Sequence, residues 1–181
     1  MILETPAPAI AAAPQGGIFL SPGTIYCAPT PSVVSTILGS CVAVCLWDTH
    51  LRMAGMNHYV LPHRADEPHS PRFGDVAIEQ LLAGMLRLGC HVASLRAKIF
   101  GGAAVLPFGA SGETVGHQNV QIALERLRHH GIPLLARRTG GRAGVLIRLY
   151  TETGDVMVHR LAEAHLAQAR RLSEPDAQFG G

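Results

Sequence analysis

Residues 33–48 read VVSTILGSCVAVCLWD, in which a mostly apolar run and a continuously apolar run are separated by Gly39 and Ser40. We expect a strand in each run, the first over residues 33–38 and the second over residues 42–47. The second run is apolar at every position, so both faces of its strand must be covered, as in an interior strand of a sheet. The pattern therefore predicts a sheet whose interior strand starts just after this Gly-Ser link.

Working outward, the chain alternates strand and helix patterns. One buried helix face is predicted for Ile78, Leu81, Leu82, Met85 and Leu86, with Gly89 as the stop. A second helix is predicted over residues 118–130, burying Val120, Ala123, Leu124 and Leu127. Strands are expected over residues 24–28, 52–61, 96–100, 134–137, 145–150 and 156–160, with a hairpin turn at residues 151–154. The fold class predicted is α/β of the α+β type, a single domain of mostly antiparallel strands with two main helices.

The domain organisation follows from where proline, glycine and alanine gather. Residues 1–17 are Ala/Pro-rich and are expected to form a disordered tail. Residues 18–161 hold the strand and helix patterns and are expected to form the folded domain. Residues 162–181 are expected to form a C-terminal helix, over residues 162–172, and a flexible end. The first residues lack the basic start of a secretory signal, so a cytoplasmic location is expected.

Composition excludes several classes of function. The chain has 181 residues, of which 48% are hydrophobic and 15% charged, as in an ordinary globular domain. The net charge is only +2 and the basic residues are scattered, which argues against nucleic-acid binding. The longest apolar run, residues 42–47, is far shorter than the roughly 20 residues that cross a bilayer. No membrane insertion is expected, and nothing indicates an obligate oligomer, so a monomer is expected.

Cysteine and histidine are the residues with chemical potential. The four cysteines, Cys27, Cys41, Cys45 and Cys90, show no CxxC spacing and are expected to be free thiols. The ten histidines form no HExxH motif, so we expect no bound metal and no cofactor. A histidine-based metal protein remains a weaker alternative hypothesis.

Cys41 and His58 form the most informative pair. If residues 48–51 form a four-residue hairpin loop, Trp47 faces Arg52 and Cys41 lies directly opposite His58. An imidazole beside a thiol can lower the thiol pKa and produce the attacking thiolate. Cys41 is therefore a candidate nucleophile. The alternative is a buried small cysteine beside a satisfied core histidine, and a slip of one residue in register would separate the pair.

The residues around Cys41 add to this hypothesis. Gly39 and Ser40 can leave backbone N–H groups free to point at an oxyanion. Cys45 lies four residues further along the same strand, about 13 Å away at about 3.3 Å per residue, so it shares neither a metal nor a disulfide with Cys41. We expect Cys45 to be core.

These segments resemble the chemoreceptor glutamine deamidase family, CheD. The matching stretches are residues 38–46 (LGSCVAVCL), 55–58 (GMNH), 61–62 (LP), 98–103 (KIFGGA), 118–120 (QNV), 131–133 (GIP), 139–141 (TGG) and 152–154 (ETG). The similarity as a whole spans about residues 25–161, nearly the whole predicted domain. The resemblance implies a layered α/β/β fold similar to the catalytic domain of the cytotoxic necrotizing factor toxins.

The resemblance also implies an activity. Family members are protein-glutamine glutaminases that convert selected glutamines of methyl-accepting chemotaxis receptors to glutamate, and some also hydrolyse glutamate methyl esters. By this resemblance Cys41 is the nucleophile and His58 the general acid and base. The family's third catalytic residue is a threonine six positions before the cysteine, which falls on Ser35 here, with Thr36 beside it. Both Ser35 and Thr36 stay candidates.

The implied partners are the cytoplasmic domains of the receptors and a CheC-type phosphatase. A second hypothesis, from a different class, is a non-catalytic regulatory module that binds chemoreceptors or such a phosphatase. Replacing Cys41 by alanine separates the two hypotheses, because only the enzyme needs the thiol.

Overall fold

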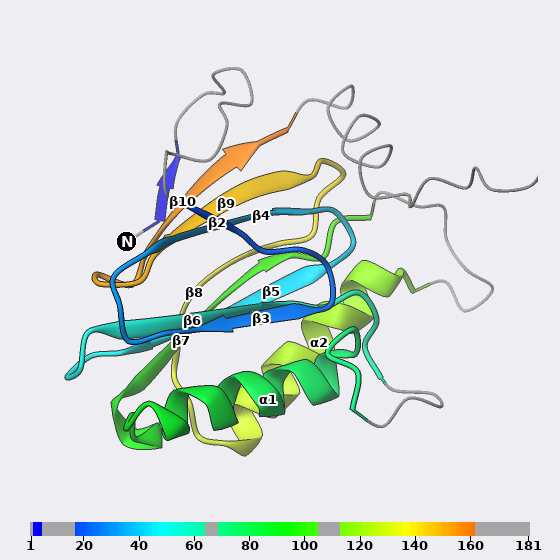
Figure 1. The fold of residues 1–181 in the computed structure, drawn as a ribbon. Helices are drawn as coiled ribbons and strands as arrows, with labels where there is room; N and C mark the ends of the chain where they lie inside the picture. Colours follow the sequence, from blue (N-terminus) through cyan, green and yellow to red (C-terminus); the bar gives the residue numbers. More distant parts are fainter. Residues whose placement is uncertain (1, 5–16, 64–68, 105–112, 162–181) are drawn as a thin grey trace, which may run out of the picture.

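The computed structural model describes residues 2–4, 17–63, 69–104 and 113–161. These residues form two five-stranded sheets and two α-helices, arranged in three layers (Figure 1). The predicted α+β class, with mostly antiparallel strands and two main helices in a single domain, is confirmed.

The inner sheet is the middle layer. Its strand order is β3 (Thr24–Cys27), β6 (Met53–His58), β5 (Val42–Asp48), β7 (Leu95–Gly101) and β8 (Leu134–Thr139). All its strand pairs are antiparallel except β7 with β8. The central strand is therefore β5, in agreement with its continuous apolar run.

The outer sheet has the order β1 (Ile2–Glu4), β10 (Asp155–Arg160), β9 (Val145–Tyr150), β4 (Val33–Leu38) and β2 (Ile18–Phe19). Its central pairs are antiparallel, while β1 and β2 pair in parallel with β10 and β4. Three residues of the expected tail thus form a strand at one edge of this sheet. The expected helix over residues 162–172 lies outside the described residues.

Helices α1 (Gly74–Arg87) and α2 (Val115–His129) cover the face of the inner sheet that points away from the outer sheet (Figure 1). A short 3-10 helix, Val92–Ser94, precedes β7. None of the helices in the described ranges is both long and apolar enough to span a membrane.

The layers enclose two apolar cores, and β5 contributes to both. Val42, Val44 and Leu46 pack with the helices, whereas Ala43 and Cys45 pack between the two sheets. This alternation is the period of two of a β-strand, and it explains why every position of the run is apolar. The prediction of an interior strand is confirmed, and so is the placement of Cys45 in the core.

The second helix begins three residues earlier than predicted. Helix α2 starts at Val115 because the Thr114 side chain accepts a hydrogen bond from the His117 amide, at 3.1 Å, and so caps the helix. The prediction that Leu86 is core is wrong, since 42% of it is exposed. Eight residues at about 100° each turn a helix about 80° past full revolutions, which carries Leu86 out of the buried arc that starts at Ile78.

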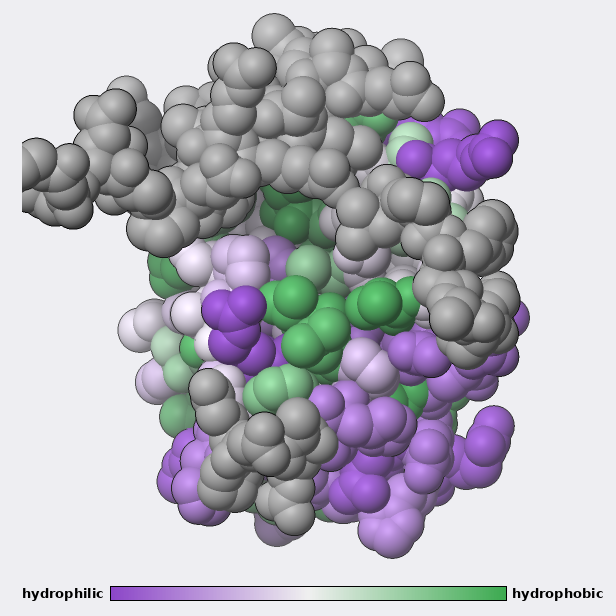
Figure 2. All heavy atoms as spheres, turned by 90° about the vertical axis from the view of Figure 1, so that its right-hand side faces the viewer, coloured by the Kyte–Doolittle hydropathy of each residue, from purple (hydrophilic) through white to green (hydrophobic). Residues whose placement is uncertain are grey.

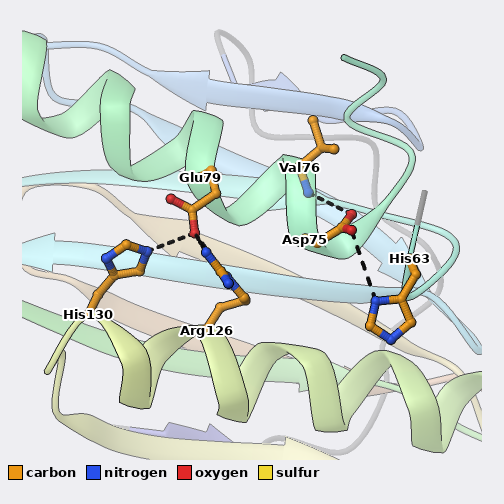
Figure 3. Close-up of polar contacts among 6 residues, drawn as sticks. All are labelled: His63, Asp75, Val76, Glu79, Arg126 and His130. Atoms are coloured by element: carbon orange, nitrogen blue, oxygen red, sulfur yellow. Dashed lines mark hydrogen bonds and ion pairs between the residues drawn. The ribbon is translucent and has the colours of Figure 1, made fainter. Parts of the chain in front are cut away.

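Polar side chains also join the two helices. Glu79 of α1 accepts hydrogen bonds from Arg126 of α2 and from His130, the residue after the helix, with Nε of Arg126 at 2.9 Å and Nε2 of His130 at 2.7 Å (Figure 3). Near the start of α1, Asp75 lies 4.0 Å from the exposed His63 (Figure 3). The helical layer is thus held by charge as well as by its apolar core.

Candidate functional site

The candidate site lies where the chain passes from one sheet to the other. Strand β4 belongs to the outer sheet and β5 to the inner one, and residues 39–41 are the whole link between them. Cys41 ends this link, is partly buried, and packs against the core between the sheets. The thiol therefore sits at one end of the layer between the two sheets.

The register of the β5–β6 hairpin differs from the prediction. Trp47 pairs with Ala54, not with Arg52, and Asp48 pairs with Met53. A bridge between Val42 and Tyr59 continues the same register. The prediction that Cys41 lies directly opposite His58 is therefore wrong by two residues.

The cause is the turn between the strands. Oδ1 of Asp48 accepts hydrogen bonds from the amides of His50 and Leu51, each at 2.9 Å. Arg52 takes a left-handed conformation, φ 54°, and its amide donates to the Asp48 carbonyl. Asp48 is thus the last residue of β5 and caps the turn, so the loop comprises residues 49–52.

A shift of two residues leaves the facing of each side chain unchanged. His58 now lies opposite Ala43, and Cys41 is its diagonal neighbour on the same face; such residues are about 7–8 Å apart, with their β-carbons somewhat closer. A slip of one residue would have turned the two side chains to opposite faces. The pair predicted from the sequence is therefore brought to one face, although not in the predicted register.

Thr36 of β4 holds the imidazole of His58. His58 is 2% exposed, and its Nδ1 lies 2.8 Å from Oγ1 of Thr36. The Thr36 hydroxyl donates its proton to the carbonyl of Leu20 at 2.7 Å. Since a hydroxyl has only one proton, Thr36 can only accept from His58, so Nδ1 carries the proton and Nε2 carries the lone pair. Among the described residues, the buried Nε2 has no hydrogen-bond partner.

Ser35 lies beside Thr36 but points the other way. Successive side chains of a strand alternate, so Ser35 faces away from His58. Its hydroxyl donates to the Ile18 carbonyl at 3.3 Å. Of the two candidates for a third residue, the structure brings Thr36 to the imidazole.

Burial keeps both members of the pair uncharged at rest. It lowers the pKa of His58 to about 4, and the nearby Leu20 carbonyl offsets only part of this shift. Burial also raises the pKa of the Cys41 thiol, an effect opposed by the amide of Cys41 itself and by the Arg72 guanidinium. A neutral imidazole on the same face as a neutral thiol is in the protonation state that a general base for that thiol needs.

The carbonyls of the link are all turned into the protein. The Gly39 carbonyl accepts from the Ala103 amide at 2.8 Å, the Cys41 carbonyl from the Gly102 amide at 2.8 Å, and the Ser40 carbonyl from Nδ2 of Asn119 at 3.0 Å. The Cys41 amide lowers the pKa of its own thiol, although the rise caused by burial is larger. These three hydrogen bonds thus fix the backbone of Gly39, Ser40 and Cys41.

Gly101 and Gly102 make this arrangement sterically feasible. Both have positive φ, 99° and 69°, and a β-carbon on Gly101 would lie 2.2 Å from the Cys41 carbonyl oxygen. The predicted tight turn near the site is therefore in contact with the backbone of Cys41.

The sequence reasoning missed Leu20, Arg72 and the roles of Tyr59 and Asn119. Asn119 is fully buried on a helix face that it shares with the buried Gly116, Ile122 and Ala123, and an unpaired amide there is costly. That mismatch is the one signal that could have drawn attention to it.

The end of the molecule that carries the link is the right-hand side in Figure 1 and faces the viewer in Figure 2. Apolar side chains gather in the middle of this face, with hydrophilic ones around them (Figure 2). Beside the Gly101–Gly102 turn lies a cleft of ≈ 870 Å³, whose lining includes Gly102, His117, Val120 and Arg137. Within the described ranges, no three His, Cys, Asp or Glu side chains gather closely enough to hold a metal ion.

Fold and site together describe an α+β protein with the thiol, imidazole and hydroxyl that cysteine-dependent hydrolases use. Residues 60–160 match the family described as CheD chemotactic sensory transduction. A Rhodospirillum rubrum protein named "Probable chemoreceptor glutamine deamidase CheD" is 61% identical over 146 residues, 81% of this chain and 83% of that protein. The chain belongs to the CheD family.

Relatives from other bacteria agree. One from Anaeromyxobacter dehalogenans, also named as a chemoreceptor glutamine deamidase, is 42% identical over 159 residues, 86% of this chain and 93% of that protein. Another with that name, from Sulfurimonas denitrificans, is 41% identical over 142 residues, 77% of this chain and 91% of that protein. The resemblance noted in the sequence is therefore confirmed.

Proposed function

We propose that this protein is a protein-glutamine glutaminase that converts selected glutamine side chains of chemoreceptors to glutamate, releasing ammonia. One observation carries the proposal. The lone pair of His58 Nε2 has no other partner among the described residues, and Cys41 lies on the same face of the sheet. The names of the relatives supply the substrate class.

In the first half-reaction the sulfur of Cys41 attacks the carbonyl carbon of the glutamine side chain. The thiol proton moves to Nε2 of His58 as the C–S bond forms, and the oxygen becomes an oxyanion. The C–N bond then breaks, and His58 returns the proton to the departing ammonia. The product is a thioester between Cys41 and the substrate's side chain.

In the second half-reaction water replaces ammonia. Its oxygen attacks the thioester carbon while one of its protons moves to Nε2 of His58. The C–S bond breaks, the sulfur regains that proton, and glutamate leaves. Thr36 keeps Nδ1 protonated through both steps and so holds the tautomer in which Nε2 can accept. A glutamate methyl ester would pass through the same thioester with methanol as the leaving group.

The substrate we propose is the cytoplasmic domain of a methyl-accepting chemotaxis receptor, which gives the protein a cytoplasmic location. The surface at the site end, apolar at its centre with polar surroundings, suits the flank of a helical partner (Figure 2). A CheC-type phosphatase is a second proposed partner.

The test is mass spectrometry of a purified receptor cytoplasmic fragment after incubation with the protein. A deamidated glutamine gains about one dalton, because hydroxyl replaces the amino group. We expect the gain at specific glutamines with the unaltered protein and with Cys45→Ala, and none with Cys41→Ala or His58→Ala. Circular dichroism of each variant checks that it is folded.

The outcome also decides between enzyme and binding module. If no receptor fragment gains mass while each folded protein, Cys41→Ala included, still binds the receptor or phosphatase, the proposed activity is wrong and a regulatory module is the better description. A mass gain that survives in Cys41→Ala would contradict the assigned nucleophile.

A further inference from the structure

Asn119 connects the helical layer to the backbone of the site. Its side chain is fully buried, and Nδ2 donates to the Ser40 carbonyl at 3.0 Å and to the Val60 carbonyl at 2.9 Å. Ser40 directly precedes Cys41, and Val60 follows the bridge that sets Cys41 beside the end of β6. One amide group thus ties the residue before Cys41 to the segment that follows β6.

The bond to Ser40 determines where the Cys41 amide points. The Ser40 carbonyl and the Cys41 N–H belong to the same planar trans peptide, so they point in opposite directions. A donor that fixes the carbonyl on the helix side therefore fixes the N–H toward the opposite side. The Cys41 side chain lies on that side too, because it packs against the core between the two sheets.

A substrate carbon bonded to that sulfur would carry its oxygen next to the same N–H. An amide already aimed at this position stabilises the oxyanion without reorganising during the reaction. Orientation of this one peptide is thus worth more in the transition state than in the ground state.

The environment of Asn119 uses only its donor capacity. Both side-chain bonds run to carbonyl oxygens, so the NH2 end must face them, and within the described part of the chain Oδ1 is buried without a partner. The backbone carbonyl of Asn119 is itself held by the Tyr59 hydroxyl at 2.5 Å. The residue is thus anchored from the end of β6 while it anchors the link.

We propose that Asn119 is a positioning residue that aims the Cys41 amide at the developing oxyanion. It acts through the Ser40–Cys41 peptide and touches no reacting atom. This inference rests on the proposed function for its consequence in catalysis, but the orientation of the peptide can be measured without any substrate.

The kinetic test compares Asn119→Leu with Thr151→Val. Leucine keeps the approximate shape and removes both donors, so we expect kcat to fall roughly 10- to 100-fold with KM within about twofold. Thr151 is a matched control because it is also buried and clamps a loop in the other sheet, through the amide and carbonyl of Ser32. Thr151→Val should lose stability while keeping kcat within about twofold.

Two further measurements need no activity. Ser40–Cys41 is the only Ser-Cys dipeptide in the chain, so carbon-13 on serine carbonyls with nitrogen-15 on cysteine gives one NMR correlation for this peptide. Loss of the Asn119 bond should move its carbonyl resonance upfield. Because the same amide stabilises the thiolate, the rate of Cys41 alkylation against pH should shift to higher pH in Asn119→Leu and stay in place in Thr151→Val.

The outcomes separate this inference from the proposed function. If the unaltered protein modifies no receptor, the function fails while the NMR and alkylation readings still decide the role of Asn119. An unchanged resonance and an unchanged alkylation profile in Asn119→Leu would overturn that role. Should Asn119→Leu not fold, Asn119→Asp, which is isosteric and keeps at most one donor, is measured in the same two ways and decides the role by the same criteria.

Discussion

Cys41, just before β5, and Cys45, within it, point to the same side of the inner sheet, yet their surroundings differ. Cys41 is partly exposed and is the diagonal neighbour of His58. Cys45 is 2% exposed, lies between Met56 and Lys98 on the neighbouring strands, and has a thiol whose pKa is raised by burial to about 12, with Lys98 offsetting little. A nearby cation does not make a thiol nucleophilic when the thiol is completely buried. A reactive thiol needs to be accessible to substrate and to have a base nearby that is free to accept its proton.

Lys98 also has a structural contact. Its Nζ donates to the Gly154 carbonyl at 2.6 Å, and so it holds the β9–β10 turn against the inner sheet. The layer between the sheets therefore contains a structural polar contact at one end and a chemically available one at the other.

The sharpest way to break this contrast is to remove each thiol in turn. Cys41→Ser should lower receptor deamidation by at least about 1000-fold, because the hydroxyl is a far weaker nucleophile with the same base. Cys45→Ser should keep the rate within about threefold and lower thermal stability. Single-turnover assays with a receptor fragment measure the first effect, and calorimetry measures the second. Comparable losses of activity in both folded variants would remove the distinction.

The pH dependence of stability tests the role of His58, the proposed base for Cys41. The pKa of His58 is about 4 in the folded protein and about 6.5 when unfolded, so between these values the unfolded chain binds more protons. The contribution of His58 to the free energy of unfolding is therefore complete above about pH 6.5. It falls by about 3 kcal/mol as the pH drops to 4, for a shift of this size. Urea unfolding at pH 7.5 and pH 4 should show this loss in Cys45→Ala and a much smaller one in His58→Gln. Equal losses in the two variants would mean that another group is responsible.

Thr36 and Ser35 test whether His58 must be held from the outer sheet. Thr36→Val removes the acceptor of Nδ1–H and should lower kcat roughly 10- to 100-fold, since the tautomer and ring orientation are no longer fixed. Ser35→Ala should stay within about threefold, because its hydroxyl bonds Ile18 instead. The reverse ranking of the two variants would restore the six-residue spacing as the better guide.

Arg72 should give the smallest effect. Its guanidinium lowers the pKa of Cys41 only in opposition to the larger rise from burial, and the side chain is exposed, so salt screens it. Arg72→Ala should slow alkylation of Cys41 about two- to threefold at pH 8 in low salt, with little difference at high salt. Alkylation of Cys45, followed in the same digest, should remain negligible.

Much of the architecture could be predicted because burial leaves a direct trace in the sequence. Residues 42–47 are apolar on both strand faces, and β5 is indeed covered on both. The Thr151–Gly154 turn, flanked by two apolar strands, predicts the β9–β10 hairpin correctly. The pairing of Cys41 with His58 on one face was also foreseeable, since it depends on parity alone.

The rest depended on interactions that no pattern displays. The hairpin register depends on the backbone amides from which Asp48 accepts hydrogen bonds and on the left-handed conformation of Arg52. The resemblance placed Ser35 at the third position, whereas the alternation of β4 gives the contact to Thr36. Asn119 is separated from Ser40 by 79 residues, so only the assembled layers reveal their hydrogen bond.

The site is built across the junction of the two sheets, so its geometry depends on how the sheets pack against each other. Thr36 lies on the outer sheet, His58 on the inner sheet and Cys41 on the link between them, and the hydrogen bond between Thr36 and His58 forms only where the two sheets pack together. A small slide of one layer over the other would leave each sheet intact while parting the imidazole from its acceptor. On heating, activity should therefore be lost before the strands unfold. The loss of activity would report how tightly the outer sheet is packed against the inner one.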